Sequence, residues 1–405
     1  MDLTPLAFDS PVDAYAAQAR ELLGAHQSGQ DWAVRAFHTH HPRFLDDVYR
    51  WLPKRLPDSE IRDAALTLAD AQLATARGYN FLDWEALTAH AAEASQPGSP
   101  VHRFEAAVEA VVNGQADELA AMLHAHPALV RERSTRVTHF DPPVHRATLM
   151  HYLAANGVEN HRQRTPANAV AIARILLEAG AEPDALASLY GGEYATMSLL
   201  VSSSHPAGAG LQIPLLKILV DYGASVESTG SEQSGSPLLT ALAFGYADTA
   251  RALVHHGAQV NDVAAAAGLG LLEDTARLLP SASSHSRHCA LALAAQLGQL
   301  EVTRLLLDAG EDPDRYNPAG FHAHATPLHH AALAGHSGVV RLLVERGARL
   351  DIQDKIYHST PRGWAEYNEH GETAALLSSL HPASGISTQD YGETPNLNPA
   401  VSDVE

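Results

Sequence analysis

Three histidines stand within four residues in the segment FHTHHPRF, residues 37–44. The whole chain has 25 His against 27 Lys and Arg together, and HxH pairs occur at 38–40, 124–126 and 322–324. Two such imidazoles and a third ligand can bind a divalent metal, which can activate water for hydrolysis. The first question is therefore whether these pairs form a metal site.

The segment around the first pair occurs again later in the chain. Residues 33–47 align with residues 118–132 at an offset of 85, which places Pro42 on Pro127. Both segments resemble a helix that ends just before a proline. Histidine in the last turn of a helix is favoured by the helix dipole. The three histidines of the first segment do not share one helical face, so we predict no metal there.

Motifs of known catalytic chemistry are missing from the chain. We find no GxSxG, no HExxH and no glycine-rich phosphate loop with lysine. Cys289 is the only cysteine, so it can form neither an intrachain disulfide nor a cysteine zinc site. It lies in the apolar run HCALALAAQLG and is predicted to be a small buried side chain. We therefore predict no catalytic residue, no cofactor and no enzymatic activity.

The charge of the chain limits its partners. The formal net charge is -20 over 405 residues. A nucleic-acid binder needs a basic face, and an anionic membrane surface attracts basic segments, so both partners are disfavoured. The N-terminus lacks the basic and apolar parts of a signal peptide, and no apolar run reaches the roughly 20 residues of a membrane helix. We expect a cytoplasmic monomer.

One sequence pattern recurs along the chain, and it predicts the helices and turns near which many of the histidines lie. An amphipathic helix ends in glycine and is followed by a turn with Asp, Asn or Glu. The five copies are IARILLEAGAEPD (172–184), LLKILVDYGASVE (215–227), TARALVHHGAQVN (249–261), VTRLLLDAGEDPD (302–314) and VVRLLVERGARLD (339–351). Their helix-ending glycines are Gly180, Gly223, Gly257, Gly310 and Gly347. A degenerate copy lies at 263–280, and a short alanine-rich helix precedes the better copies.

The segment TPLHHAALAGHSGVVRLLVERGARLDIQD, residues 326–354, resembles the ankyrin repeat nearly position for position. Weaker copies extend the resemblance over most of residues 102–380. The resemblance implies stacked helix–turn–helix units with hairpin fingers along one edge, and protein binding on the concave face. It also implies that His329 in TPLH and His151 in TLMH are buried and bond to loop backbone.

A helical segment before the repeats is similar to one found in a narrower group of bacterial ankyrin proteins. It reads LADAQLATARGYNFLDWEALTAH, residues 68–90, and has no assigned chemistry. Asp83 is a good N-cap for a helix that begins at Trp84. We predict an all-α ankyrin-repeat solenoid in three parts: a helical cap at 1–95, an array of about seven units at 96–380 and a flexible tail at 381–405.

The segment between Gly310 and Thr326 is longer than a normal hairpin finger and is rich in aromatic and imidazole rings. Neighbouring fingers of stacked repeats lie side by side, so its rings should meet those of the next finger. The predicted C-terminal patch consists of Tyr316, Phe321, His322, His324, His330, Tyr357, His358 and Trp364. Two alternatives stay open: Trp364 could belong to the core, and His322, His324 and His358 could hold a metal.

Two insertions, at residues 157–169 and 202–214, lengthen neighbouring repeats. They could be loops that grew at tolerant sites, or they could form a recognition surface. The predicted N-terminal patch consists of Tyr152, Arg162, Arg164, Tyr190, Tyr194 and His205. Tyr and Arg contribute strongly to binding when they are desolvated in a contact.

The function that these patterns favour is a non-enzymatic scaffold that binds another protein through its concave face and enlarged loops. This step rests on the family resemblance, because a fold alone does not fix a function. The alternative is a protein that binds a small ligand or a divalent metal through its His/Tyr loops, with hydrolysis as a further option.

Overall fold

The computed structural model describes residues 4–155, 159–227 and 235–380. The predicted tail, 381–405, lies outside the described residues. The chain divides into two compact units. Unit 1 comprises Met1–Ala224 with Thr229–Ser234, and unit 2 comprises Ser225–Ser228 with Gly235–Glu405. Each unit is described by itself.

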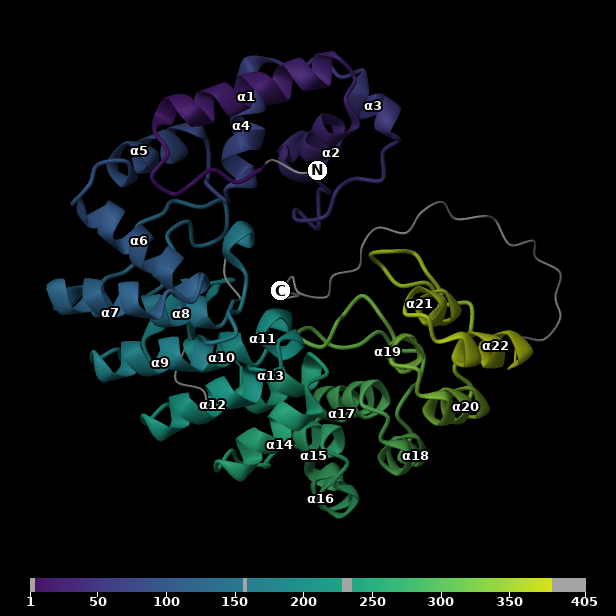
Figure 1. Ribbon diagram of the computed structural model, residues 1–405. Helices are drawn as coiled ribbons and strands as arrows, with labels where there is room; N and C mark the ends of the chain where they lie inside the picture. The colour runs from purple at the N-terminus through teal and green to yellow at the C-terminus, as the bar shows by residue number, and fades with distance from the viewer. Residues whose placement is uncertain (1–3, 156–158, 228–234, 381–405) are drawn as a thin grey trace. The chain divides into compact units, whose positions relative to one another are not determined.

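Unit 1 contains the N-terminal helices and the first repeats (Figure 1). Its α-helices are α1 (Val12–Gln27), α2 (Asp31–His40), α3 (Asp58–Arg62), α4 (Leu68–Gly78), α5 (Trp84–Ala94), α6 (Pro100–Val112), α7 (Ala116–Ala125), α8 (Leu149–Leu153), α9 (Ala169–Glu178), α10 (Thr196–Leu200), α11 (Ser204–Gly208) and α12 (Gln212–Asp221). Its strands are β1 (Leu186–Leu189) and β2 (Gly192–Ala195).

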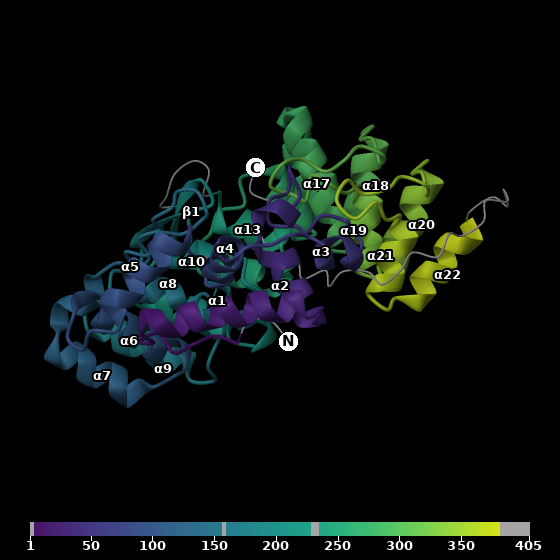
Figure 2. The ribbon, with the colours of Figure 1, turned by 90° about the horizontal axis from the view of Figure 1, so that it is seen from above.

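Unit 2 is a row of helix pairs. Its α-helices are α13 (Pro237–Ala243), α14 (Ala247–His255), α15 (Val263–Gly268), α16 (Leu272–Leu278), α17 (Ser284–Gln296), α18 (Leu300–Asp308), α19 (Pro327–Leu333), α20 (Ser337–Glu345), α21 (Pro361–Tyr367) and α22 (Gly371–Leu380). The odd-numbered helices form an inner row and the even-numbered ones an outer row (Figure 1). The pairs α17/α18, α19/α20 and α21/α22 follow one another in sequence order (Figure 2).

The recurring glycines end the helices as the repeat pattern predicts. All five have positive φ, from 90° at Gly310 to 105° at Gly257. In the first of them, the Gly180 N–H donates to the Leu177 carbonyl at 3.0 Å. A left-handed residue at this place lets the chain turn out of the helix, and glycine adopts that conformation without a Cβ clash.

The motif segment before the repeats owes its two helices to side-chain caps. Thr67 and Asp70 form a reciprocal capping box at the start of α4. The Asp83 carboxylate accepts the Ala86 N–H at 2.9 Å, which confirms Asp83 as the N-cap of α5. Tyr79 and Phe81, between the helices, are buried in an aromatic core. The conspicuous aromatic residues of this motif therefore pack inside unit 1.

The histidine-rich segment at 37–44 is a helix end, as the alignment predicts. Helix α2 ends at His40, and a short 3-10 turn begins at Pro42. The ring of His38 bonds the Lys54 carbonyl at 2.7 Å, whereas the ring of His41 lies 3.2 Å from the Asp70 carboxylate. These rings have different partners, one on a loop carbonyl and the other at the capping box.

One short hairpin interrupts the helices of unit 1. Strands β1 and β2 pair antiparallel, with Leu186 opposite Ala195. Their turn residues Tyr190 and Gly191 both have positive φ, at 50° and 74°, as a tight two-residue hairpin turn requires. This hairpin is a finger of the kind that the ankyrin resemblance implies.

Candidate functional site

Two histidines at equivalent places begin inner helices and hold the next finger. At His151, Nδ1 accepts the Thr148 N–H at 3.1 Å, and Nε2 lies 3.2 Å from the Tyr194 carbonyl. At His329, Nδ1 accepts the Thr326 N–H at 3.2 Å, and Nε2 lies 3.1 Å from the Ser359 carbonyl. Both rings are buried, and burial lowers the pKa of each to about 4. The structure agrees with the expected role of these rings in holding loop backbone.

A third histidine with this role was missed in the sequence. His288 in α17 is fully buried, and its Nε2 lies 3.0 Å from the Tyr316 carbonyl. Its helix begins with SHSRHCAL rather than a TPLH phrase, so the motif gave no signal there. The long finger of unit 2 is thus attached to the inner row at its base.

Replacing His329 or His151 by Ala is expected to lower the free energy of unfolding by about 1–3 kcal/mol, because buried loop carbonyls lose their donor. Urea unfolding of each variant measures this. His255→Ala, which changes an exposed ring at the end of α14, is the matched control and should change stability by less than about 0.5 kcal/mol. Wild-type stability in both variants would contradict the structural role.

Three members of the predicted C-terminal patch belong to the core of unit 2. The exposed fractions of His324, His330 and Trp364 are 8%, 5% and 4%. The ring of Trp364 packs against both imidazoles, with centroids 5.7 Å from His324 and 5.2 Å from His330. These three side chains are therefore buried within unit 2. For Trp364, the core alternative is the one the structure shows.

A buried aspartate organises the loop in front of Trp364. The Asp354 carboxylate accepts backbone N–H groups from Ile356, Tyr357 and Ser359, and the indole Nε1–H of Trp364 at 3.1 Å. Asp354 is 1% exposed, so these donors replace water around its charge. This residue was not singled out in the sequence, because an Asp in a loop is usually a solvated turn residue.

Two other members of the C-terminal patch, Tyr316 and His358, line a groove between two fingers. We call residues 309–326 the first finger and residues 346–360 the second finger. Tyr316, Phe321 and Tyr357 are partly exposed, and His358 is exposed. A groove of about 710 Å³ lies between the fingers. Its lining is Asp314, Tyr316, Arg349, Asp351, Ile352, Gln353, Asp354, Lys355 and His358.

Three contacts hold side chains of this groove in place. The Lys355 ammonium lies 4.2 Å from the centre of the Tyr316 ring, and the Tyr316 hydroxyl donates to the Gln353 carbonyl at 2.7 Å. The Arg349 guanidinium donates to both oxygens of Asp351. The groove therefore presents an aromatic ring, cations and carboxylates that are already held in place.

The predicted N-terminal patch requires a larger correction. Arg162 is 2% exposed and lies inside unit 1, not on its surface. Its guanidinium donates to Glu105 at 2.5 Å, to Glu159 at 2.8 Å and to Glu109 at 2.8 Å. The Tyr152 hydroxyl donates to Glu159 at 2.6 Å, so it too has an internal partner. Arg162 of the first insertion thus points inward.

Of the remaining members of this patch, Tyr194 is buried, whereas Arg164, Tyr190 and His205 are exposed or partly exposed. Arg164 is half exposed and lies 3.6 Å from Glu109. Tyr194 is 8% exposed, and its ring contacts Tyr190 at the hairpin turn, with centroids 6.2 Å apart. His205, on α11, is partly exposed. They do not join Arg162 in a continuous surface patch, because Arg162 is interior.

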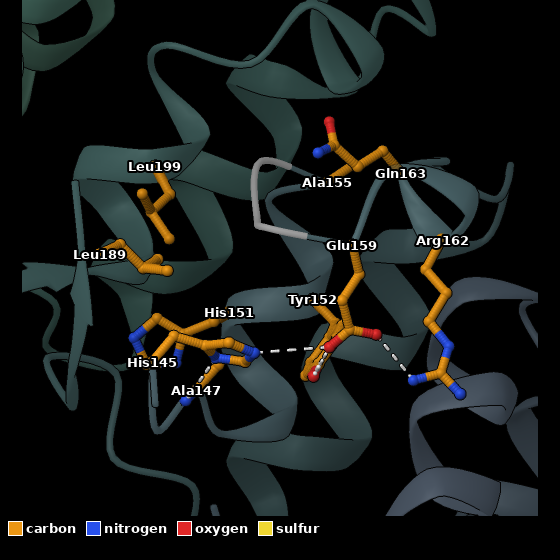
Figure 3. Close-up of a pocket in the computed structure, with 10 residues that line it drawn as sticks. All are labelled: His145, Ala147, His151, Tyr152, Ala155, Glu159, Arg162, Gln163, Leu189 and Leu199. Atoms are coloured by element: carbon orange, nitrogen blue, oxygen red, sulfur yellow. Dashed lines mark hydrogen bonds and ion pairs between the residues drawn. The ribbon is translucent and has the colours of Figure 1, made fainter. Parts of the chain in front are cut away.

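Glu159 lies at the centre of a buried charge cluster, shown between Tyr152 and Arg162 in Figure 3. Its second carboxylate oxygen also faces Arg136 at 3.2 Å, and its first faces His145 at 3.5 Å. Glu105 is buried as well, and it faces Arg136 at 3.5 Å and His90 at 3.2 Å. We call Glu105, Glu159, Arg136 and Arg162 the buried charge cluster; its two carboxylates balance its two guanidinium groups.

The cluster was missed in the sequence, although one weak signal exists. Glu105 occupies an apolar face of the α6 segment HRFEAAVEAVV, where a lone carboxylate needs a buried partner. Burial by itself would raise the pKa of Glu105 and Glu159, but Arg136 and Arg162 outweigh it and hold both pKa values well below the usual range. Both carboxylates are therefore charged at neutral pH.

A cavity next to Glu159 is lined by His145, Tyr152 and Arg162, with Leu189 and Leu199 on its apolar side (Figure 3). Its volume is about 30 Å³, which holds roughly one or two water molecules. Glu159 accepts bonds on both oxygens and has a strongly lowered pKa, so it is a poor general base. The arrangement stabilises a fold and offers no activated nucleophile.

Within residues 4–155, 159–227 and 235–380, no group of three or more His, Cys, Asp or Glu is arranged to hold a metal ion. In the same residues, none of the helices combines the length and apolar character of a membrane span.

Comparisons with known proteins point to one family. The family model described as ankyrin repeats (3 copies) matches residues 262–354 and 291–390. Among curated proteins, XBAT31 of Arabidopsis thaliana, named as an E3 ubiquitin-protein ligase, is 31% identical over 27% of this chain and 23% of its own length. Ankyrin repeat and SAM domain-containing protein 6 of Mus musculus is 30% identical over 26% of this chain and 12% of its own length.

Ankyrin repeat-containing protein P1E11.10 of Schizosaccharomyces pombe is 36% identical over 16% of this chain and 28% of its own length. The chain thus matches less than a third of the length of each of these relatives. Among solved structures, the human ASB11 ankyrin repeat domain aligns with 69% of this chain and 99% of its own, at 16% identity and a TM-score of 0.35. That TM-score is too low to support a conclusion. The matched region shows that residues 262–390 contain ankyrin repeats, which agrees with the helix pairs of unit 2.

Proposed function

We propose that this chain is a non-enzymatic scaffold and that it binds a partner protein at the groove between the two fingers of unit 2. The observation that carries the proposal is the groove itself, which combines the partly exposed Tyr316 ring with Lys355 and Arg349. Ankyrin repeats commonly bind other proteins, and Asp314 and Tyr316 of the first finger line the groove.

Preorganisation supports this choice over the N-terminal patch. The Tyr316 ring is held at its hydroxyl by Gln353 and covered on one face by Lys355, so little side-chain freedom is lost on binding. Tyrosine and arginine are the residue types that most often dominate binding energy. In the N-terminal patch, by contrast, Arg162 and the Tyr152 hydroxyl already bind within the unit.

Replacing Tyr316 and Lys355 together by Ala is expected to weaken partner binding at least about 10-fold, because two preorganised contact groups are lost. The partner would first be isolated from the native cell with the full chain as bait. Binding of the purified partner would then be measured by calorimetry.

Tyr316→Phe is the matched control, because it keeps the ring over Lys355 and removes only the bond to Gln353. It should bind within about threefold of the wild type if the ring provides the contact. Unchanged affinity of the double variant, with wild-type circular dichroism and unfolding temperature, would remove the groove from the proposal.

A further inference from the structure

The first finger of unit 2 reaches a helix far back in the chain. The ring of His322 bonds the Ala243 carbonyl at 2.9 Å across 79 residues of sequence. The same ring contacts Phe244, with centroids 6.1 Å apart. Ala243 ends α13, whereas the first finger leads into α19, so the contact spans the inner row past α15 and α17 (Figure 1).

Other contacts hold the same loop on the side of α19 and α21. The His322 ring lies 4.8 Å from His330 of α19. The His324 carbonyl accepts the Lys355 N–H at 2.8 Å, and the His324 ring packs on Trp364 of α21. Residues 316–325, which we call the cover loop, are therefore attached at both ends of this stretch of the inner row.

The cover loop also has internal structure. Within it, the Asn317 N–H donates to the Ala325 carbonyl, and the Ala325 N–H donates to the His322 carbonyl at 3.1 Å. His322 has φ of 61°, a left-handed conformation that is unfavourable for a residue with a Cβ. A residue keeps such a conformation only when surrounding contacts hold it there. For His322, those contacts are Ala243, Phe244 and His330.

The inner row is close enough for one loop to cross it. Helix α15 is made of small residues, Ala264–Gly268 after Val263, and all are buried. The Gln296 side chain of α17 reaches past α15 to the same Ala243 carbonyl, at 2.7 Å. Small residues allow close helix approach, so α13 and α17 come within one side-chain length of each other. The His322 side chain therefore reaches Ala243 on the same inner row as Gln296.

We infer that the cover loop is an intramolecular occupant of the inner side of unit 2, held closed by His322 on Ala243, and that it directs a partner to the groove between the fingers. This inference rests on the proposed protein-binding function, because the position of the cover loop decides which surface of unit 2 is open to a partner protein. The concave side of these repeats, which the sequence suggested as a binding face, becomes accessible only when the loop is released.

Hydrogen–deuterium exchange on the full chain tests the contact without any partner. His322→Asn keeps a residue type that tolerates left-handed φ, but its side chain is too short to replace the ring. The amides of Phe321 and Ala325 are bonded within the loop and serve as reporters. Loss of one anchoring bond should speed their exchange about 10-fold, while the amides of α18 and α20 keep their protection.

His358→Asn is the matched control. His358 also has left-handed φ, at 51°, but it is exposed and lies on the second finger. It should leave exchange in the cover loop unchanged. Phe244→Ala, which changes the other side of the contact, should reproduce the effect of His322→Asn. If both anchor variants leave exchange at residues 316–325 at the wild-type rate, the His322 contact does not hold the loop and the inference is wrong.

Binding of the apolar dye ANS tests whether the loop covers a surface. Release of the loop should expose Phe244 and the neighbouring inner row, so dye fluorescence should rise at least about twofold in His322→Asn and stay at the wild-type level in His358→Asn. Faster exchange without increased dye binding would show a loop that covers nothing, which also overturns the inference. Neither result depends on the groove proposal, which can fail separately through the Tyr316 and Lys355 variant.

Discussion

Replacing Arg162 by Met is expected to lower the free energy of unfolding of unit 1 by about 3–5 kcal/mol, because it leaves buried carboxylates without their main cation. Glu105 and Glu159 are 1% and 3% exposed, so bulk solvent does not stabilise their charges once the guanidinium is removed. Arg136 remains, but its distances to the two carboxylates are longer, at 3.5 and 3.2 Å. Urea unfolding, followed by hydrogen–deuterium exchange at the amides of unit 1, measures the loss of unfolding free energy.

Arg164→Met is the matched control for this prediction. Its side chain comes from the same loop and faces Glu109, but it is half exposed and 3.6 Å away. Exposed ion pairs contribute about 0–1 kcal/mol, so this variant should remain close to wild type. Adding Glu159→Gln to Arg162→Met should recover part of the loss, because one unpaired charge is removed. Equal stability of the Arg162 and Arg164 variants would contradict the interior role of Arg162.

The buried charge cluster explains why the segment before the repeats is attached to them. Arg136 donates to the Tyr79 carbonyl at 3.4 Å, and its guanidinium lies 4.5 Å from the centre of the Phe81 ring. The Asn80 side chain accepts the Asn160 N–H at 2.9 Å. The GYNF part of the motif thus contacts the loops that carry the cluster. We therefore propose that this motif connects the N-terminal helices to the first repeats.

Acidification is expected to destabilise unit 1 before unit 2. Burial lowers the pKa of His139 and His151 to about 4 and that of His161 to about 3, and all three lie in unit 1. In unit 2, His329 has a pKa of about 4, and those of His288 and His336 are lowered by burial. These rings are neutral in the folded state, whereas the unfolded chain protonates its histidines near pH 6.5.

The sign of the effect follows from proton binding. Between about pH 6.5 and 4 the unfolded state binds more protons than the folded state, so stability falls as the pH falls. Each such histidine contributes up to about 1.4 kcal/mol per pH unit. Below pH 4.5, protonation of Glu105 and Glu159 acts in the same direction, because their folded pKa values are lowered. The loss therefore begins in the histidine range and continues in the carboxylate range.

Hydrogen exchange at pH 7.5, 6.5, 5.5 and 4.5, corrected for the intrinsic pH dependence of exchange, can follow both units in one sample. Peptides from α6 and α9 report on unit 1, and peptides from α18 and α20 report on unit 2. His151→Ala is the control for mechanism, since it should be less stable at pH 7.5 but lose less stability on acidification than wild type. An equal loss of stability in both units on acidification, or a gain of stability at pH 5.5, would refute the assignment of the pH effect to the buried histidines of unit 1.

The helix pairs, their glycine ends and the buried histidines could be predicted from the sequence because each depends on local pattern. Apolar spacing, a left-handed glycine and a TPLH motif each determine structure within one repeat. They recur in several repeats of the chain, which makes the pattern easy to recognise. Asp83 as an N-cap depends only on the three residues that follow it. The caps before Pro42 and the fingers after the glycines belong to the same class of feature.

Only the tertiary structure decided which charged and aromatic residues of the insertions face inward. Arg162 meets Glu105 across 57 residues, and His322 meets Ala243 across 79. A loop with arginine, histidine and tyrosine looks the same in sequence when it faces a partner and when it folds onto its own repeats. The choice depends on whether the packed helices present an opposite charge or a free carbonyl at the right place, and such pairing across distant segments leaves no local pattern in the chain.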